Sequence, residues 1–231
     1  MDIFAQQLIN GLILGSIYAL IALGYTMVYG ILGLINFAHG EIVMIGAMVC
    51  ITCLNLLLGH FGDVSPLVAV LFSVLMAIPI CAALGYSIER VAYRPLRNAP
   101  RLAPLITAIG VSIVLQNLAM MIWGRQYVPF PSIFANTPHQ IFGASITSLQ
   151  ISIIVLAMLL MIALWLLVQK TKLGRAMRAT AQNPQVASLM GVNVNQVIAM
   201  TFILGSCLGA VAGIMVAANY GQAHAYMGFL L

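Results

Sequence analysis

Residues 170–195 read KTKLGRAMRATAQNPQVASLMGVNVN and form the longest polar interval between two apolar segments. Asn183 comes directly before Pro184, and proline fits the first turn of a helix because its missing N–H would have no partner there. Gly191 follows, as glycine often does just beyond a helix end. The pattern predicts one short capped helix from Pro184 to Met190.

The apolar residues of this short helix fall on one side. Val186, Leu189 and Met190 occupy positions i, i+3 and i+4, so they form a narrow stripe. A helix of roughly two turns is not stable alone in water. We expect the stripe to lie on either a partner protein or lipid headgroups, and the residues alone favour neither.

The composition of the whole chain indicates a membrane protein. Of its 231 residues, 63% are hydrophobic and only 6% are charged, whereas about a quarter are charged in soluble domains. The charge-free runs reach the ~20 residues that a membrane-spanning helix needs, and they do not alternate polar with apolar residues as barrel strands do. We therefore predict an all-α, polytopic transmembrane bundle in a single domain, 1–231, with about six spans at 8–35, 42–58, 67–88, 102–123, 149–168 and 197–218.

Of the nine basic residues, all but Arg125 fall in two groups, Arg90, Arg94, Arg97 and Arg101, and Lys170, Lys172, Arg175 and Arg178. Such grouping is the positive-inside signal of membrane proteins rather than a nucleic-acid footprint. It predicts a cytoplasmic loop at 170–196 and, since three spans precede Arg90, an external amino terminus. If the span 42–58 were re-entrant, the amino terminus would instead be cytoplasmic.

Tyr18, Tyr25 and Tyr29 lie on one face of the first span together with several glycines. One interpretation is close helix packing, which small residues allow. The other is that this face borders a translocation path, because tyrosine hydroxyls that face lipid would lack hydrogen-bond partners.

Asn36, His39 and Glu41 interrupt the apolar pattern between the first two spans. They form either a turn at the membrane surface, where headgroup water solvates them, or a broken helix that lines a cavity. In the second case they belong to the translocation path, and an ionisable pair inside a membrane needs a functional reason. His39 and Glu41 are two positions apart and would not share a helix face.

A ridge of small residues runs along the last span at every fourth position. This spacing predicts a tight contact with another helix. The residues are Thr201, Gly205, Gly209, Gly213 and Ala217.

The sequence offers little for catalysis. No Ser or Cys lies beside a His in a nucleophile arrangement, and the phosphate-binding pattern G-x-x-x-x-G-K-[ST] is absent. Cys50 and Cys53 have C-x-x-C spacing without other ligand types nearby, so we expect neither a metal site nor a cofactor. If ATP drives transport here, a separate subunit must hydrolyse it.

Three motifs resemble one known family. INFAHGEIVMIGA at 35–47, ERVAYRPLR at 89–97 and the long segment LGRAMRATAQNPQVASLMGVNVNQVIAMTFILGSCLGAVAGIM at 173–215 are similar to inner-membrane permease subunits of bacterial branched-chain amino acid ABC importers, those of the high-affinity leucine/isoleucine/valine type. The resemblance covers essentially the whole chain. The family's coupling pattern Ala-x-x-x-Gly falls here on Ala187 and Gly191.

The resemblance implies a transport subunit rather than an enzyme, located in the bacterial inner membrane. Its expected partners are a homologous second permease, two ATPase subunits, a periplasmic amino-acid-binding protein and membrane lipid, with no nucleic acid. The short helix, from Asn183 to Gly191, would be the coupling helix. Such permeases usually contain further spans, so we expect the carboxyl end to be truncated.

Two other classes remain open from the residues. An ion-coupled secondary transporter or channel for small apolar solutes would carry its coupling residues within the membrane, where only His39 and Glu41 qualify. An intramembrane enzyme would need a catalytic cluster at the same depth. Uptake that followed a proton gradient and ignored ATP would favour the secondary transporter.

Overall fold

The computed structural model describes residues 2–60, 65–97, 99–100, 102–131, 138–141 and 144–230. Within these residues, six helices are long and apolar enough to cross a membrane. This confirms the all-α, multi-pass fold and the number of spans that the sequence predicts. The six are α1 (Asp2–Leu32), α2 (His39–His60), α3 (Pro66–Ile88), α4 (Leu102–Trp123), α5 (Ser148–Lys170) and α8 (Val194–Tyr220).

Several helix ends follow from local chemistry. α4 begins and ends at the predicted residues. α5 starts at a capping box: the Thr147 hydroxyl accepts a hydrogen bond from the Gln150 N–H, and the Gln150 side chain accepts one from the Thr147 N–H. α2 begins at His39, ahead of the predicted residue 42, so the polar residues His39 and Glu41 belong to its first turn.

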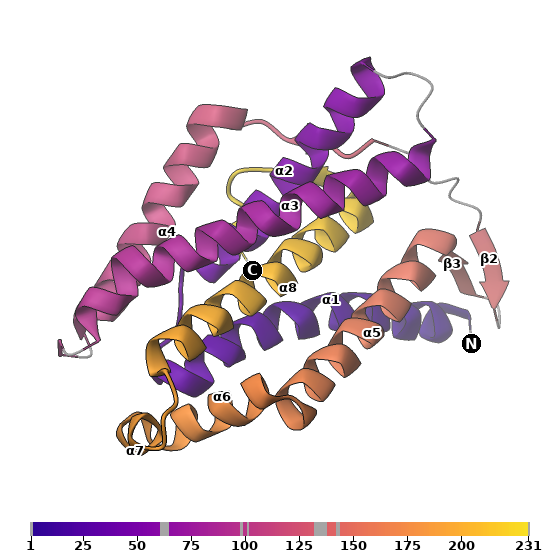
Figure 1. Ribbon diagram of the computed structural model, residues 1–231. Helices are drawn as coiled ribbons and strands as arrows, with labels where there is room; N and C mark the ends of the chain where they lie inside the picture. Colours follow the sequence, from indigo (N-terminus) through magenta and orange to yellow (C-terminus); the bar gives the residue numbers. More distant parts are fainter. Residues whose placement is uncertain are drawn as a thin grey trace.

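α8 lies at the centre of the bundle and packs against α1, α2 and α3 (Figure 1). The predicted ridge makes this contact: a Cβ on Gly205 would lie 3.3 Å from the Gly24 carbonyl oxygen of α1, and one on Gly213 would meet the Val43 carbonyl of α2. The helix backbones approach closely because glycine has no side chain there. The interpretation of the ridge as a helix-packing surface is confirmed.

α4 and α5 lie at the periphery of the bundle. Few of their side chains are buried, and large apolar residues such as Met121 and Trp165 point outwards. Outward-facing apolar side chains are expected of helices that border lipid or another membrane subunit.

The segment after α3 carries several charges but does not form an exposed loop. The chain continues as a π-helical turn, η1 (Glu89–Tyr93), and a 3-10 turn, η2 (Arg94–Leu96). Glu89 and Tyr93 are 1% and 2% exposed. Burial is possible because both side chains have protein partners: Glu89 pairs with Arg97, and the Tyr93 hydroxyl donates to the Asn36 side-chain oxygen at 3.0 Å.

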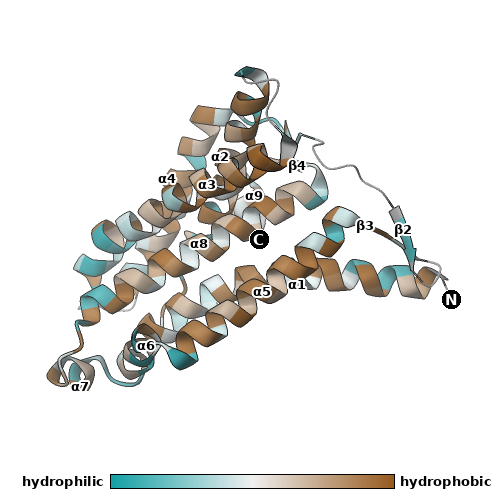
Figure 2. Cartoon of the chain, turned by 45° about the vertical axis from the view of Figure 1, so that its right-hand side comes forward, coloured by the Kyte–Doolittle hydropathy of each residue, from teal (hydrophilic) through white to brown (hydrophobic). Residues whose placement is uncertain are grey.

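The two ends of the bundle carry different secondary-structure elements (Figure 2). One end carries η1, η2 and two short helices between α5 and α8, namely α6 (Lys172–Gln182) and α7 (Pro184–Leu189). Both basic groups therefore lie at the same end, as the positive-inside rule requires, apart from Arg101, which is outside the described residues.

The opposite end carries the amino terminus and four short strands that the sequence did not predict. β2 (Pro138–Ile141) pairs with β3 (Ala144–Thr147), and β1 (Val128–Pro129) pairs with β4 (Gln222–Ala223). Gln6 of α1 hydrogen-bonds to the backbone of Ser145. After β4 a short helix, α9 (Met227–Leu230), packs against α2, and Figure 1 shows this end of the chain near the centre of the bundle.

Candidate functional site

The short helix expected after Asn183 is present as α7. The Asn183 side-chain oxygen accepts hydrogen bonds from the backbone N–H groups of Gln185 and Val186, at 3.0 and 3.1 Å. Met190 is the C-cap, and Gly191 has a φ of +82°, a left-handed conformation that favours glycine. The Val192 N–H then reaches back to the Ala187 carbonyl at 3.0 Å, which closes a Schellman motif.

The apolar stripe of α7 faces away from the protein. Val186, Leu189 and Met190 are 53%, 86% and 80% exposed, whereas Ala187 is buried. No described residue of the chain therefore covers the stripe. Figure 1 shows α7 at the extreme end of the bundle.

α6 holds α7 in this position, and sequence reasoning missed it as a helix. Gly174 lies directly under the end of α5, where a Cβ would meet the carbonyl groups of Leu167 and Val168. Arg178 donates a hydrogen bond to the Val168 carbonyl. The signal was available: Gly174, Met177 and Thr180, three residues apart, are the buried positions of an otherwise polar helix.

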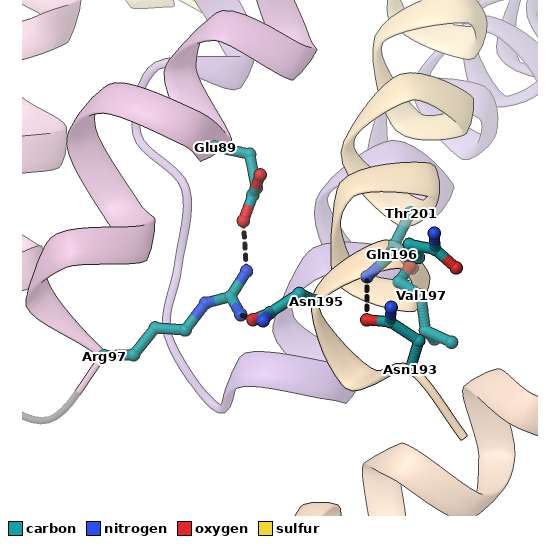
Figure 3. A network of polar contacts seen from close by, with 7 residues as sticks. All are labelled: Glu89, Arg97, Asn193, Asn195, Gln196, Val197 and Thr201. Atoms are coloured by element: carbon teal, nitrogen blue, oxygen red, sulfur yellow. Dashed lines mark hydrogen bonds and ion pairs between the residues drawn. The ribbon is translucent and has the colours of Figure 1, made fainter. Parts of the chain in front are cut away.

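A polar network joins the segment after α3 to the start of α8 (Figure 3). The Arg97 guanidinium pairs with the Glu89 carboxylate and also donates to the Asn195 side-chain oxygen. Burial lowers the pKa of Arg97, and the neighbouring Glu89 carboxylate opposes that shift. Asn195 follows α7 by only a few residues, so this network links the region of α7 to α3.

A cavity of about 760 Å³ opens beside this network. Its wall is formed by the end of α1, by η1 and η2, by the first turn of α7 and by the start of α8. The lining residues are Ile31, Leu32, Leu34, Tyr93, Arg94, Arg97, Pro104, Gln182, Asn183, Pro184, Gln185, Val194, Asn195 and Ile198.

Asn36, His39 and Glu41 are buried at the start of α2, with exposures of 1–2%. The expectation of a turn at the membrane surface is therefore wrong, because no headgroup water reaches them. His39 and Glu41 face different neighbours, as their spacing requires. The His39 ring packs against Tyr25, with ring centroids 4.7 Å apart, and the Ser112 hydroxyl of α4 donates to Glu41 Oε1 at 3.0 Å.

The three tyrosines of α1 are only partly brought to this cluster. Tyr25 is half-buried against His39. Tyr18 and Tyr29 are 45% and 53% exposed on the outer face of α1. Ser112 completes the cluster from a distant part of the sequence, and nothing in its local sequence indicates this role.

The described residues contain no group of three or more His, Cys, Asp or Glu side chains that could hold a metal ion. The ionisable groups near the cluster are too few for a metal-ligand set. The chemistry this arrangement can provide is binding and conformational coupling.

Comparison with protein families gives one clear match. The family model described as the permease component of branched-chain amino acid transport systems matches residues 7–231. No solved structure matches significantly.

Curated relatives agree with the family model. The high-affinity branched-chain amino acid transport system permease protein LivH of Salmonella typhimurium is 47% identical over 98% of this chain and 75% of its own length. LivH of Escherichia coli K12 is 46% identical, and the corresponding BraD of Pseudomonas aeruginosa is 45% identical, with the same coverage.

Proposed function

This chain belongs to the family of permease components of branched-chain amino acid transport systems, and from that premise we propose how its parts perform transport. It is the permease subunit of an ATP-binding-cassette importer for branched-chain amino acids, a transport protein rather than an enzyme. Its six apolar helices place it in the bacterial inner membrane as a multi-pass protein.

Permeases of such importers work with ATPase subunits. We propose the finer composition: a homologous second permease, two ATPase subunits, and a periplasmic amino-acid-binding protein on the external face. In this arrangement residues 1–231 act as one permease domain, and the loop 170–196 faces the cytoplasm.

α7 is the proposed docking element for an ATPase subunit. Its exposed stripe of Val186, Leu189 and Met190 suits a hydrophobic groove on a soluble partner. The cap residue Asn183, with Pro184, Ala187 and Gly191, keeps the helix folded and correctly oriented. The single observation that carries this proposal is the uncovered stripe on a rigidly capped helix at the end of the bundle.

The polar network provides a route from α7 into the membrane. A displacement of α7 moves the start of α8, and Asn195 passes the movement to Arg97 and Glu89 at the end of α3. The cavity between these elements would then change shape as the ATPases close, which is alternating access by movement of packed elements.

The path for the amino acid is proposed to run along α1 and the start of α2. Tyr18, Tyr25 and Tyr29 would contribute hydroxyls, and Asn36, His39 and Glu41 would form its narrow buried part. The support is that all of these groups but Asn36 lie within the spans, where a polar group needs a functional or structural partner, and that Asn36 is buried between α1 and α2.

Leu189→Asp in the complete transporter, reconstituted in proteoliposomes, tests the docking proposal. We expect ATP-driven leucine uptake to fall on the order of 30-fold, because a charge replaces a central apolar anchor. Ser188→Asp is the matched control, since it adds the same charge to an exposed position beside the stripe. Unchanged uptake with Leu189→Asp, or uptake that follows a proton gradient without ATP, would contradict the proposal.

A further inference from the structure

α2 begins inside the bundle rather than at its end. Leu32 and Leu34 line the cavity next to Arg97 and α7. His39, a few residues later, already lies between Gly24 of α1 and Gly209 near the middle of α8: a Cβ on Gly209 would be 3.1 Å from the His39 ring. The chain therefore turns back into the bundle after α1, and the first turn of α2 lies level with the middle of α8.

Glu41 is the acidic group of this first turn, and one of its two oxygens is free. Oε1 accepts a hydrogen bond from Ser112, which lies at the middle of α4. Oε2 is buried and has no hydrogen-bond partner among the described residues. His39 Nε2 likewise has none within the described part of the chain.

Gly228 and Gly40 let α9 approach the start of α2 closely beside the free oxygen. A Cβ on Gly228 of α9 would lie 2.7 Å from Glu41 Oε2. A Cβ on Gly40 would lie 3.2 Å from the Tyr25 hydroxyl and would also meet the Gly228 carbonyl. Side chains at these positions would clash with these atoms, so glycine permits the close contact of α9 with the start of α2 beside the carboxylate.

No basic side chain neutralises this carboxylate among the described residues, where the ion pair is that of Arg97 with Glu89 at the end of α3. A carboxylate buried in an apolar medium is costly unless it meets a cation or a proton. In a permease for amino acids, each transported molecule carries a cation in its α-ammonium group, with three N–H donors.

We propose that Glu41 Oε2 binds the α-ammonium group of the amino acid in transit, as a subsite within the bundle. Ser112 positions the carboxylate through Oε1 and leaves Oε2 as the acceptor for the substrate. Tyr25, half-buried at the edge of the cluster, separates the subsite from the exposed face of α1. This assignment rests on the transport function proposed above and adds which chemical group of the substrate is recognised.

Ligand retention by the purified complete transporter in nanodiscs tests the subsite. Radiolabelled leucine is the probe, and 2-hydroxy-4-methylpentanoate, which has a hydroxyl in place of the ammonium group, is the competitor. For the wild type we expect the hydroxy acid to bind about 30-fold more weakly than leucine, as for loss of one buried charged hydrogen-bonded pair.

Glu41→Gln should weaken leucine binding to the level of hydroxy-acid binding and leave hydroxy-acid binding unchanged. The same interaction is then missing because of the protein rather than because of the ligand. Ser112→Ala should weaken leucine binding by about fivefold, which corresponds to the loss of one positioning hydrogen bond. Ser73→Ala is its matched control: the hydroxyl of this buried serine donates to the Ala69 carbonyl of its own helix, and the substitution should not change leucine binding.

Three results would overturn the subsite: equal weakening of both ligands by Glu41→Gln, wild-type leucine affinity in Glu41→Gln, or no leucine retained by the wild type at millimolar concentration. ATP-driven leucine uptake by the same purified transporter, reconstituted in proteoliposomes, separates the subsite from the proposed transport function. If the wild type takes up leucine but the expected differences in ligand binding are absent, only the subsite is refuted. If the wild type shows no ATP-driven uptake, the proposed transport function itself is refuted.

Discussion

Glu89 and Arg97 form an ion pair at the end of α3, and the two side chains differ in solvent exposure. Glu89 is almost completely buried, and Arg97 reaches it from the turn after η2 while also contacting Asn195 of α8. Removing one member of such a pair is more harmful than removing both, because a lone buried charge remains.

Arg97→Gln should therefore lower the free energy of unfolding by on the order of 3 kcal/mol, since it leaves the Glu89 carboxylate buried without a counter-charge. The double variant Glu89→Gln/Arg97→Gln should recover most of this loss. Thermal unfolding of the purified transporter measures both effects. Arg90→Gln, an exposed arginine of the same segment, is the control; equal losses in the single and double variants would show that the pair is not coupled.

At this scale the sequence predicts types of residue but not their partners. Asn36, His39 and Glu41 could be singled out because polar residues are rare in apolar runs. Ser112 could not be assigned to Glu41, nor Asn195 to Arg97, because those contacts join residues far apart in sequence. The choice between a surface turn and a buried cluster needed the same tertiary information.

Among the elements, α8 depends most on its glycines. Gly213 faces the Val43 carbonyl of α2, whereas a Cβ on Gly110 of α4 would meet nothing within 4 Å. Both glycines lie inside membrane-spanning helices.

Gly213→Ala should reduce stability by about 1–3 kcal/mol, because the added methyl group forces α8 away from α2. Gly110→Ala should be neutral or slightly stabilising, since alanine favours helix and has space there. The comparison is made by thermal unfolding of the two variants in the same detergent. A similar effect of both substitutions would mean that helix propensity, not packing, decides the result.

Asn183→Ala tests the cap of α7. Loss of a side-chain cap costs about 1 kcal/mol, which corresponds to roughly fivefold more frequent opening of the helix. Hydrogen exchange at the Val186 and Ala187 amides should accelerate accordingly. Gln185→Ala, an exposed change in the same helix, should leave the rate unaltered, and no acceleration in Asn183→Ala would show that packing of Ala187 alone holds α7.

The elements that could be predicted share a local signal. The spans follow from apolar length, the α8 ridge from its every-fourth spacing, and α7 from Asn183, Pro184 and Gly191. α6 was missed because its charges suggested a solvated segment, although its buried side is regular. The short strands were missed because each pairs only two to four residues, too few to produce an alternating pattern.

For the whole molecule, the two ends and the middle have separate roles. One end carries the basic groups and α7, the opposite end carries the short strands, and the start of α2 places Glu41 between them. In the proposed account, energy enters at the end that carries α7, and the substrate binds near Glu41. The account therefore depends on α7 meeting an ATPase subunit rather than lipid.

The most direct measurement places a photoreactive amino acid at position 189 of the complete transporter in its native membrane. Leu189 is 86% exposed on α7, and Met158, 53% exposed on the peripheral helix α5, is the matched control position. We predict a cross-link to an ATPase subunit from position 189 and none from position 158. A cross-link from position 189 to phospholipid alone would contradict the account.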